Sequence, residues 1–469
     1  MKDASTPMPD WRQALVAQLG EDNVCLDTGI AGAHARDWSE AAGTTPAMVL
    51  FPRTPEQVAQ ALAILGKAGK KVAVQGGLTG LAGGAAPQPG EIALSLARLN
   101  RIEEFDRVGG TVTAQAGVTL EQLQTHVEAE GWMFPLDLGA RGTCQVGGNA
   151  ATNAGGNRVI RYGTMRELVL GIEVALADGT LLTMLNRVTK NTTGIDLKHL
   201  FIGAEGTLGV ITRLVLKLSP RPSSAVTALC ALDSFDAATR LAREMRRELP
   251  TLSAFELMWE DFMEAAVGAT GQKPPFAERY PVYALVEVLG TDDAEDRDRL
   301  ERFLGRALEE GIAGDVIVAQ SLEHSRQLWQ YREAIGELLS RLKPHAAFDV
   351  GIPVPAMGAF VDTVRAALKQ RFPDQSHLFF GHIGDGNLHL LSGPYPAAAA
   401  LHEVEAMVYA EVGNVKGSIS AEHGIGVVKK DFLHVSRSAE ELALMQKLKA
   451  LLDPMRVLNA GRIIDGGAD

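Results

Sequence analysis

The chain has 469 residues, more than a single ordinary core accommodates, so we expect two or more domains. Apolar residues make up 46% of the sequence and charged residues 22%, a balance typical of a globular protein. No stretch approaches the ~20 consecutive apolar residues that a membrane span needs. The formal net charge of −12 argues against a nucleic-acid-binding surface.

The cysteines and the N-terminus bear on the compartment. Cys25, Cys144 and Cys230 are widely spaced and odd in number, which predicts neither a disulfide framework nor a cysteine metal site. The first residues lead into a polar amphipathic stretch without an apolar signal core. We therefore expect a cytoplasmic protein, with peripheral association with a membrane left open.

The first predicted elements are a capped helix and a strand that ends in glycines. Thr54 is followed by Pro55 at the first helical position and by Gln57 three places after the cap, with apolar residues at helical spacing beyond. Residues 71–75 predict a strand, and residues 76–84 contain five glycines. Such a loop lets the backbone approach a ligand and present N–H groups to anionic oxygens. The same signals predict a strand at 111–114 and a helix capped by Thr119.

Two further glycine-rich segments follow, at residues 139–156 and 203–209. One such segment alone more often marks ordinary turns, but three within one half of the chain favour a ligand site. None has the G-x-G-x-x-G spacing of a dinucleotide-binding strand–helix unit, and no GxxxxGK[ST] loop is present. The pattern indicates a nucleotide held by dispersed loops, and argues against nicotinamide or ATP binding.

From about residue 223 the pattern changes to strands alternating with long helices. Strands are predicted at 282–288 and 315–318, and helices at 292–310 and 322–342.

Histidines in the last third point to a metal and a base. Four turn-forming residues, 384–387, separate two apolar strands, and pairing Ile383 with Leu388 would place His382 opposite His389, with Cβ atoms ~5 Å apart. Glu422 would add a third ligand and leave a position open, as catalytic zinc requires. His423 is then the natural base. The alternatives are satisfied structural histidines or a structural zinc; Mn, Fe or Co would fit the same ligands.

Together these segments resemble the FAD-linked oxidases of the vanillyl-alcohol-oxidase superfamily, in particular the D-2-hydroxyacid dehydrogenases. The resemblance spans nearly the whole chain. It rests on residues 52–58, 75–84, 147–156 and 200–209, both histidine motifs, and Asp453-Pro454 with Leu458-Asn459.

The resemblance implies an α+β fold, in which a two-subdomain FAD-binding fold of the vanillyl-alcohol-oxidase type carries a ferredoxin-like cap, an antiparallel sheet with helices on one face. The implied domains are 1–222 for FAD binding, 223–430 for the cap with the metal site, and 431–469 as a helical segment returning to the FAD domain.

The resemblance also implies noncovalent FAD, because the first loop has no His or Cys to attach the flavin. Cys144 in the second loop is a minor caution. The pyrophosphate is expected on the first loop and the rest of the cofactor on the other two segments. The implied FAD-binding residues are Gln75, Gly76, Gly77, Thr79, Gly80, Gly142, Thr143, Gln145, Gly147, Gly148, Asn149, Asn153, Gly155, Gly156, Glu205, Gly206, Gly209, Ile211 and Asn459.

The expected reaction follows from these groups. A 2-hydroxy acid chelates the metal through its hydroxyl and carboxylate, His423 takes the hydroxyl proton, and hydride passes from C2 to flavin N5, leaving a 2-keto acid. Arg332 matches the family position that grips a substrate carboxylate. The alternative for Arg332 is an exposed helical arginine paired with a neighbouring acid.

The substrate side chain is harder to predict. Hydroxyglutarate enzymes have a threonine, a lysine and an asparagine around the distal carboxylate, which align with Gly336, Ala347 and Leu391. Because none of these three residues has a polar side chain, the sequence favours D-lactate or a larger D-2-hydroxy monocarboxylate. The alternative, D-2-hydroxyglutarate or D-malate, would rely on Arg332 with Lys343, and is favoured by first and second loops that look closer to the hydroxyglutarate enzymes.

Partners follow only from the resemblance. Relatives pass electrons to electron-transfer flavoprotein, a cytochrome or a quinone, and no motif here distinguishes these. Oligomeric state is equally open. Two alternatives belong to other classes. One is a phenol-oxidising flavoprotein, which would need a phenolate-binding cluster and not His382, His389 and Glu422. The other is a non-catalytic flavin electron-transfer subunit.

Overall fold

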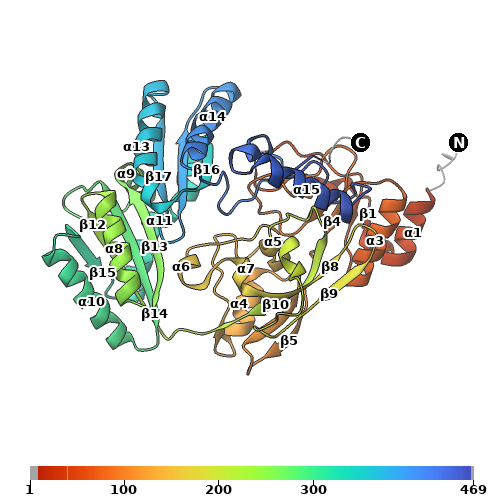
Figure 1. The fold of residues 1–469 in the computed structure, drawn as a ribbon, viewed down its shortest axis with the longest axis horizontal. Coiled ribbons are helices and arrows are strands. Elements are labelled where there is room, and N and C mark those ends of the chain that lie inside the picture. The colour runs from red at the N-terminus through yellow and green to blue at the C-terminus, as the bar shows by residue number, and fades with distance from the viewer. Residues whose placement is uncertain (1–8, 40, 466–469) are drawn as a thin grey trace. The chain divides into compact units, whose positions relative to one another are not determined.

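The computed structural model describes residues 9–39 and 41–465 and divides into two compact units (Figure 1). The first comprises the chain up to Gly155, Thr164–Arg221, and the chain from Glu422 onward. The second comprises Gly156–Gly163 and Pro222–Ala421. Within the described residues no helix combines the length and the apolar character needed to cross a membrane.

A four-stranded sheet opens the first unit. Its order is β1-β2-β4-β3, and β2 and β3 both run parallel to β4. The Thr54 side chain accepts from the Gln57 N–H and caps the helix between β2 and β3, so the predicted helix and strand are confirmed. The elements of this region are α1 (Asp10–Leu19), a 3-10 turn (Glu21–Asn23), β1 (Val24–Cys25), α2 (Thr28–Ala33), β2 (Val49–Leu50), α3 (Pro55–Lys67), β3 (Val72–Gln75) and β4 (Ile92–Ser95).

A five-stranded antiparallel sheet, ordered β5-β6-β10-β8-β9, forms the rest of this unit. Thr119 and Gln122 form a capping box at the start of α4, as predicted. One apolar core, running from Leu15 to Leu458, joins both sheets. The elements are β5 (Ile102–Asp106), β6 (Thr111–Gln115), α4 (Leu120–Glu128), β7 (Trp132–Met133), α5 (Val146–Ala151), α7 (Met165–Leu168), β8 (Val169–Ala175), β9 (Leu181–Met184), a 3-10 turn (Leu197–Leu200), β10 (Val210–Lys217) and β11 (Ser219–Pro220).

The end of the chain is fastened to the first sheet. After a 3-10 turn (Lys430–Val435) and α15 (Ala439–Leu452), Val457 accepts from the Val72 N–H (2.7 Å), and the Asn459 N–H donates back to Val72 (2.9 Å). The buried Lys449 ammonium donates to Thr207 O, Leu458 O and the Asp453 carboxylate. These contacts place Asn459 beside the strand that leads into the first glycine loop.

The second unit is built on a seven-stranded sheet, ordered β15-β12-β14-β13-β17-β18-β16, in which every pair is antiparallel. The predicted strands at 282–288 and 315–318 are confirmed as β14 and β15. The strands are β12 (Ser224–Leu232), β13 (Leu252–Trp259), β14 (Val282–Gly290), β15 (Asp315–Val318), β16 (Ala346–Gly351), β17 (Ser376–His382) and β18 (Asn387–Gly393). Arg161 of α6 (Val159–Tyr162) donates to Thr251 O, which ties that short segment to this unit.

Helices cover both faces of this sheet, so the expectation of one covered face is wrong. Every residue of β14 is buried. Its alternate residues Tyr283 and Leu285 share a core with α9, α11 and α12, and the residues between them point to the opposite face. The predicted helix at 322–342 is also interrupted, because Ala334 (ψ 4°) ends α11 and precedes α12. The helices are α8 (Phe235–Glu248), α9 (Glu260–Thr270), α10 (Asp293–Glu309), α11 (Leu322–Glu333), α12 (Ile335–Arg341), α13 (Val354–Arg371) and α14 (Ala398–Asn414).

Candidate active site

The hairpin β17–β18 presents both predicted histidine ligands, in a register that differs from the expected one. His382 lies opposite Asn387, and His389 lies opposite Phe380. The turn occupies residues 383–386, one position earlier than predicted, because the Asn387 N–H donates to the Asp385 carboxylate (3.1 Å) and starts the second strand there. A pairing shift of two residues keeps side chains on the same face, so the two imidazole centroids still lie 5.4 Å apart.

One ligand atom from each of His382, His389 and Glu422 lies within 4.8 Å of the other two. Glu422 directly follows Ala421, whose N–H donates to Asp349 O on β16 (3.2 Å), so the chain delivers Glu422 next to the hairpin's neighbouring strand. A second such group consists of Asp349, Glu422 and His423. Two imidazoles and a carboxylate are suitable ligands for zinc. The structure thus brings the three predicted ligands together with the predicted base, and metal binding stays a prediction.

A buried carboxylate that the sequence patterns do not predict supports His382. Glu256, on β13, accepts from His382 Nδ1 (2.5 Å) through one oxygen and from Arg332 Nε (2.8 Å) through the other. Burial opposes ionisation of Glu256, but His382 and Arg332 outweigh it and hold the pKa of this carboxyl below its usual value. A carboxylate on Nδ1 orients the imidazole and would leave Nε2 as the nitrogen that a metal could take. The sequence signal is slight: Glu256 is the one charged residue in β13.

Arg332 is buried, at 5% exposure, so the alternative of an exposed helical arginine is wrong. Its Nη2 lies 3.4 Å from His382 Nε2, and its guanidinium lies over the Phe380 ring, 4.7 Å from the centroid. Phe380 in turn stacks on His389, with centroids 4.9 Å apart. The guanidinium is therefore packed among the proposed ligands, and its contact with a substrate stays a prediction.

The three positions compared with hydroxyglutarate enzymes do not share one environment. Leu391 is buried in the apolar core with Leu378 and Phe380. Ala347, its cross-strand partner, is exposed, as is Gly336 on α12. Gly336 lines an open hollow of about 390 Å³ that also includes Arg341.

The first two glycine loops approach each other closely in the first unit. A Cβ at Gly77 would lie 2.1 Å from Thr143 O, so only glycine allows this approach. In the second loop Gln145 Oε1 and Asn149 Oδ1 are buried without a hydrogen-bond partner among the described residues. Buried polar atoms that the protein leaves unsatisfied can be satisfied by a bound group or by water. The loops therefore fit FAD.

Several side chains predicted to bind FAD make hydrogen bonds within the protein. Gln75 pairs with the His34 ring (2.7 Å) and donates to His34 O and Ala85 O. Asn153 accepts from Arg166 N, and Asn459 donates to Glu205 O (2.6 Å) and accepts from Val74 N (2.8 Å). The side chains of these residues hold the loops in place, and their contact with a cofactor stays a prediction.

Glu205 also turns its side chain toward the protein. Its carboxylate accepts from the N–H groups of Ile425 (2.7 Å) and Gly426 (2.8 Å). Burial raises the pKa of Glu205, and these two N–H groups oppose the rise.

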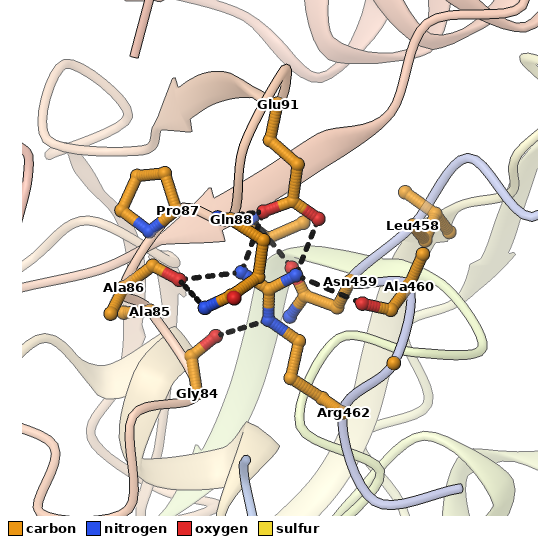
Figure 2. A network of polar contacts seen from close by, with 12 residues as sticks. Gly84, Ala85, Ala86, Pro87, Gln88, Glu91, Leu458, Asn459, Ala460 and Arg462 are labelled. Carbon is orange, nitrogen blue, oxygen red and sulfur yellow. Dashed lines mark hydrogen bonds and ion pairs between the residues drawn. The ribbon is translucent and has the colours of Figure 1, made fainter. Parts of the chain in front are cut away.

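A network around Arg462 supports the end of the first loop (Figure 2). The Arg462 side chain is 1% exposed and pairs with both oxygens of Glu91. It also donates to the carbonyl oxygens of Gly84 (3.2 Å), Ala86 (2.7 Å) and Ala460 (3.2 Å). Arg462 and Glu91 are not predicted from the sequence, because they lie 371 positions apart and belong to no common motif.

Comparison with known structures defines the class. p-Cresol methylhydroxylase superposes with a TM-score of 0.78 at 16% identity, over 98% of this chain and 97% of that one. 4-Ethylphenol oxidase from Gulosibacter chungangensis gives 0.75 at 16%, over 97% and 96%. The fold is the two-domain FAD-binding fold of the vanillyl-alcohol-oxidase type, as predicted.

Sequence comparison then defines the family. The profile for the FAD binding domain matches residues 46–185, and that for the C-terminal domain of FAD linked oxidases matches residues 221–463. D-2-hydroxyglutarate dehydrogenase of Xanthomonas citri pv. viticola is 39% identical over 438 residues, 92% of each chain. The mitochondrial enzyme of that name from Bos taurus is 41% identical over 431 residues, 91% of this chain and 78% of that one. A putative mitochondrial D-lactate dehydrogenase of Schizosaccharomyces pombe is 38% identical over 433 residues, 90% and 82%.

The chain belongs to the FAD-linked D-2-hydroxyacid dehydrogenase family and is an FAD-dependent oxidoreductase. The cytoplasmic location stays an expectation, since two of these relatives are named as mitochondrial.

Proposed function

We propose that this protein oxidises a D-2-hydroxy acid to the 2-keto acid, with His382, His389 and Glu422 as metal ligands and His423 as the base. The observation that carries the proposal is the convergence of the three ligand atoms within 4.8 Å. Such a cluster in a member of this flavoprotein family has a direct use, because a 2-hydroxy acid is a natural chelator.

We assign FAD binding to residues 1–222 and 431–469, and the cap with its metal ligands to residues 223–430. When bound, FAD accepts two electrons and the C2 hydrogen of the substrate. The unsatisfied Gln145 and Asn149 oxygens and the tight approach at Gly77 support this assignment.

The chain's own residues divide the remaining work. A divalent metal, with zinc the best match to two imidazoles and a carboxylate, would acidify the substrate hydroxyl. Glu256 orients His382 through Nδ1, and Arg332 pairs with the substrate carboxylate. His423 accepts the hydroxyl proton at a ring nitrogen.

For the side chain of the substrate we propose a monocarboxylate such as D-lactate or a larger homologue. The absence of polar side chains at Gly336, Ala347 and Leu391 supports it. D-2-hydroxyglutarate is the second candidate, favoured by the names of relatives at 39% and 41% identity. That substrate would rely on Arg332, with Lys343 as a second cation.

The test is to add D-2-hydroxyglutarate, D-lactate, D-2-hydroxybutyrate and D-mandelate separately to the purified protein without oxygen, and to follow the visible flavin absorbance. We expect rapid bleaching by at least one D-acid and none by its L-enantiomer. The bleaching acid also decides between the two substrate classes. A yellow protein that none of these acids bleaches would contradict the proposed function.

A further inference from the structure

The short segment that follows His423 is bound to the first unit through its backbone. The N–H groups of Ile425 and Gly426 donate to the two oxygens of Glu205, at 2.7 and 2.8 Å. The next N–H, of Val427, donates to Ala82 O in the first glycine loop at 3.0 Å. Three consecutive peptide groups beyond His423 are therefore anchored to groups in the same unit.

Glu205 is itself held rigidly. It adopts a left-handed backbone conformation with φ +49°, which is unusual for a residue with a side chain. Its N–H donates to Ala151 O (2.8 Å), and its carbonyl oxygen accepts from Asn459 Nδ2 (2.6 Å). These contacts aim the carboxylate at residues 425 and 426 rather than at solvent, and the residue is 8% exposed.

The segment after His423 also packs tightly against the first glycine loop. A Cβ at Gly426, where φ is +51°, would lie 2.0 Å from Ala82 O. Only glycine permits this approach, so the segment rests directly on the loop that we assign to FAD.

We propose that Glu205 is a positioning residue that holds His423 in a fixed place relative to the FAD-binding loop. This role rests on the proposed function of His423 as the base. It assigns the Glu205 side chain to the protein's own backbone, whereas family resemblance groups Glu205 with the residues that bind FAD.

The two oxygens of a carboxylate can accept both N–H groups at once, and charge strengthens each hydrogen bond. A glutamine at this place offers one acceptor and turns an NH₂ group toward a second donor. Glu205→Gln should therefore release the backbone beyond His423. A shift of ~1 Å at a catalytic group costs about 10²-fold in rate.

The experiment compares Glu205→Gln with Glu173→Gln. Glu173 is an equally buried carboxylate in the same unit, but it accepts from Arg213 and Thr212 within the five-stranded sheet. We expect Glu205→Gln to retain FAD and metal, to lower kcat roughly 10²-fold, and to leave KM within about twofold. Glu173→Gln should keep a normal kcat. Glu205→Asp, with its carboxylate withdrawn by one methylene, replaces Glu205→Gln if that variant does not fold.

The double variant Glu205→Gln/His423→Ala separates a positioning role from a general loss of structure. If Glu205 acts through His423, the double variant is no slower than His423→Ala alone. Additive losses, a normal kcat in Glu205→Gln, or loss of FAD with normal kcat after FAD is restored would each overturn the proposal.

Hydrogen exchange gives an answer that does not depend on turnover. The Ile425 and Gly426 amides should exchange faster in Glu205→Gln than in the parent protein, and unchanged protection would overturn the proposal. If the parent protein itself is reduced by no D-2-hydroxy acid, or if His423→Ala keeps full activity, the proposed function fails instead, and the exchange result still decides whether Glu205 holds the segment.

Discussion

Two buried glutamate–arginine pairs, one in each unit, differ in how completely the protein uses the arginine. Arg462 makes five hydrogen bonds, two to Glu91 and three to backbone carbonyl oxygens (Figure 2). Arg332 gives one hydrogen bond to Glu256 and has a longer contact with His382, while its Nη1 has no hydrogen bond among the described residues. All N–H donors of Arg462 are used within the protein, whereas Arg332 has donors left that a ligand could use.

The partner carboxylates differ in the same way. Besides its arginine, Glu91 accepts a hydrogen bond from the Gln88 N–H of its own loop, whereas Glu256 accepts one from the imidazole of His382. Burial and residue type are the same in both pairs. The donors and acceptors left over distinguish the structural pair from the pair beside the proposed site.

The largest effect is expected from substitution of His423, the proposed base. His423→Ala is expected to keep FAD but to slow flavin reduction by substrate about 10²- to 10⁴-fold, because no group then takes the hydroxyl proton. Stopped-flow reduction without oxygen measures this rate. His434→Ala, at an exposed histidine, is the control. Near-normal reduction in His423→Ala would remove His423 from the mechanism.

Substituting each of the two arginines in turn tests whether Arg332 and Arg462 have different roles. Arg332→Lys should lower kcat/KM about 10²-fold, because lysine loses the planar fork that matches a carboxylate. Arg462→Met should instead lower the free energy of unfolding by roughly 3–5 kcal/mol, since it strands Glu91 as a buried charge. Chemical denaturation and steady-state kinetics on both variants measure the two effects. The distinction between the pairs is lost if both variants show the same pattern.

The carboxylates should differ in their influence on the metal. Glu256→Gln is expected to weaken metal affinity about 10- to 100-fold, because Glu256 orients His382 from behind. Glu91→Gln should leave that affinity unchanged. Competition with a chromogenic chelator gives both values. Equal metal affinity in the two variants would argue that His382 is not a ligand.

The smallest effect is expected at an exposed pair. Arg437 and Glu441 lie one helical turn apart with about half of each side chain exposed. Arg437→Ala should change the free energy of unfolding by no more than about 0.5 kcal/mol, because water screens the interaction. A larger change in thermal unfolding would show that exposure is a poor guide to pair energies in this protein.

Local features of the chain are predictable from the sequence because their causes are local. Thr54 and Thr119 cap helices through residues three positions away, and the first glycine loop follows β3 as expected. The three proposed metal ligands are also recognisable, since His382 and His389 lie on one hairpin and Glu422 precedes the proposed base.

Features that depend on distant pairing are not predictable in this way. Glu256 lies 126 positions before His382, and its place beside that histidine follows from the order of strands in the sheet. The hairpin register depends on where a turn starts, and a change of one position there moves every cross-strand pair. Helices on the second face of the sheet become evident only once strands such as β14 are seen to be buried on both sides.

The most direct test of the account is metal removal. The protein is stripped with a chelator until metal analysis shows none while FAD stays bound, then mixed without oxygen with the D-2-hydroxy acid that reduces the untreated protein. We expect the flavin to stay yellow, and bleaching to return when Zn²⁺ is added. Bleaching at the original rate in the stripped protein would contradict the proposed roles of His382, His389 and Glu422.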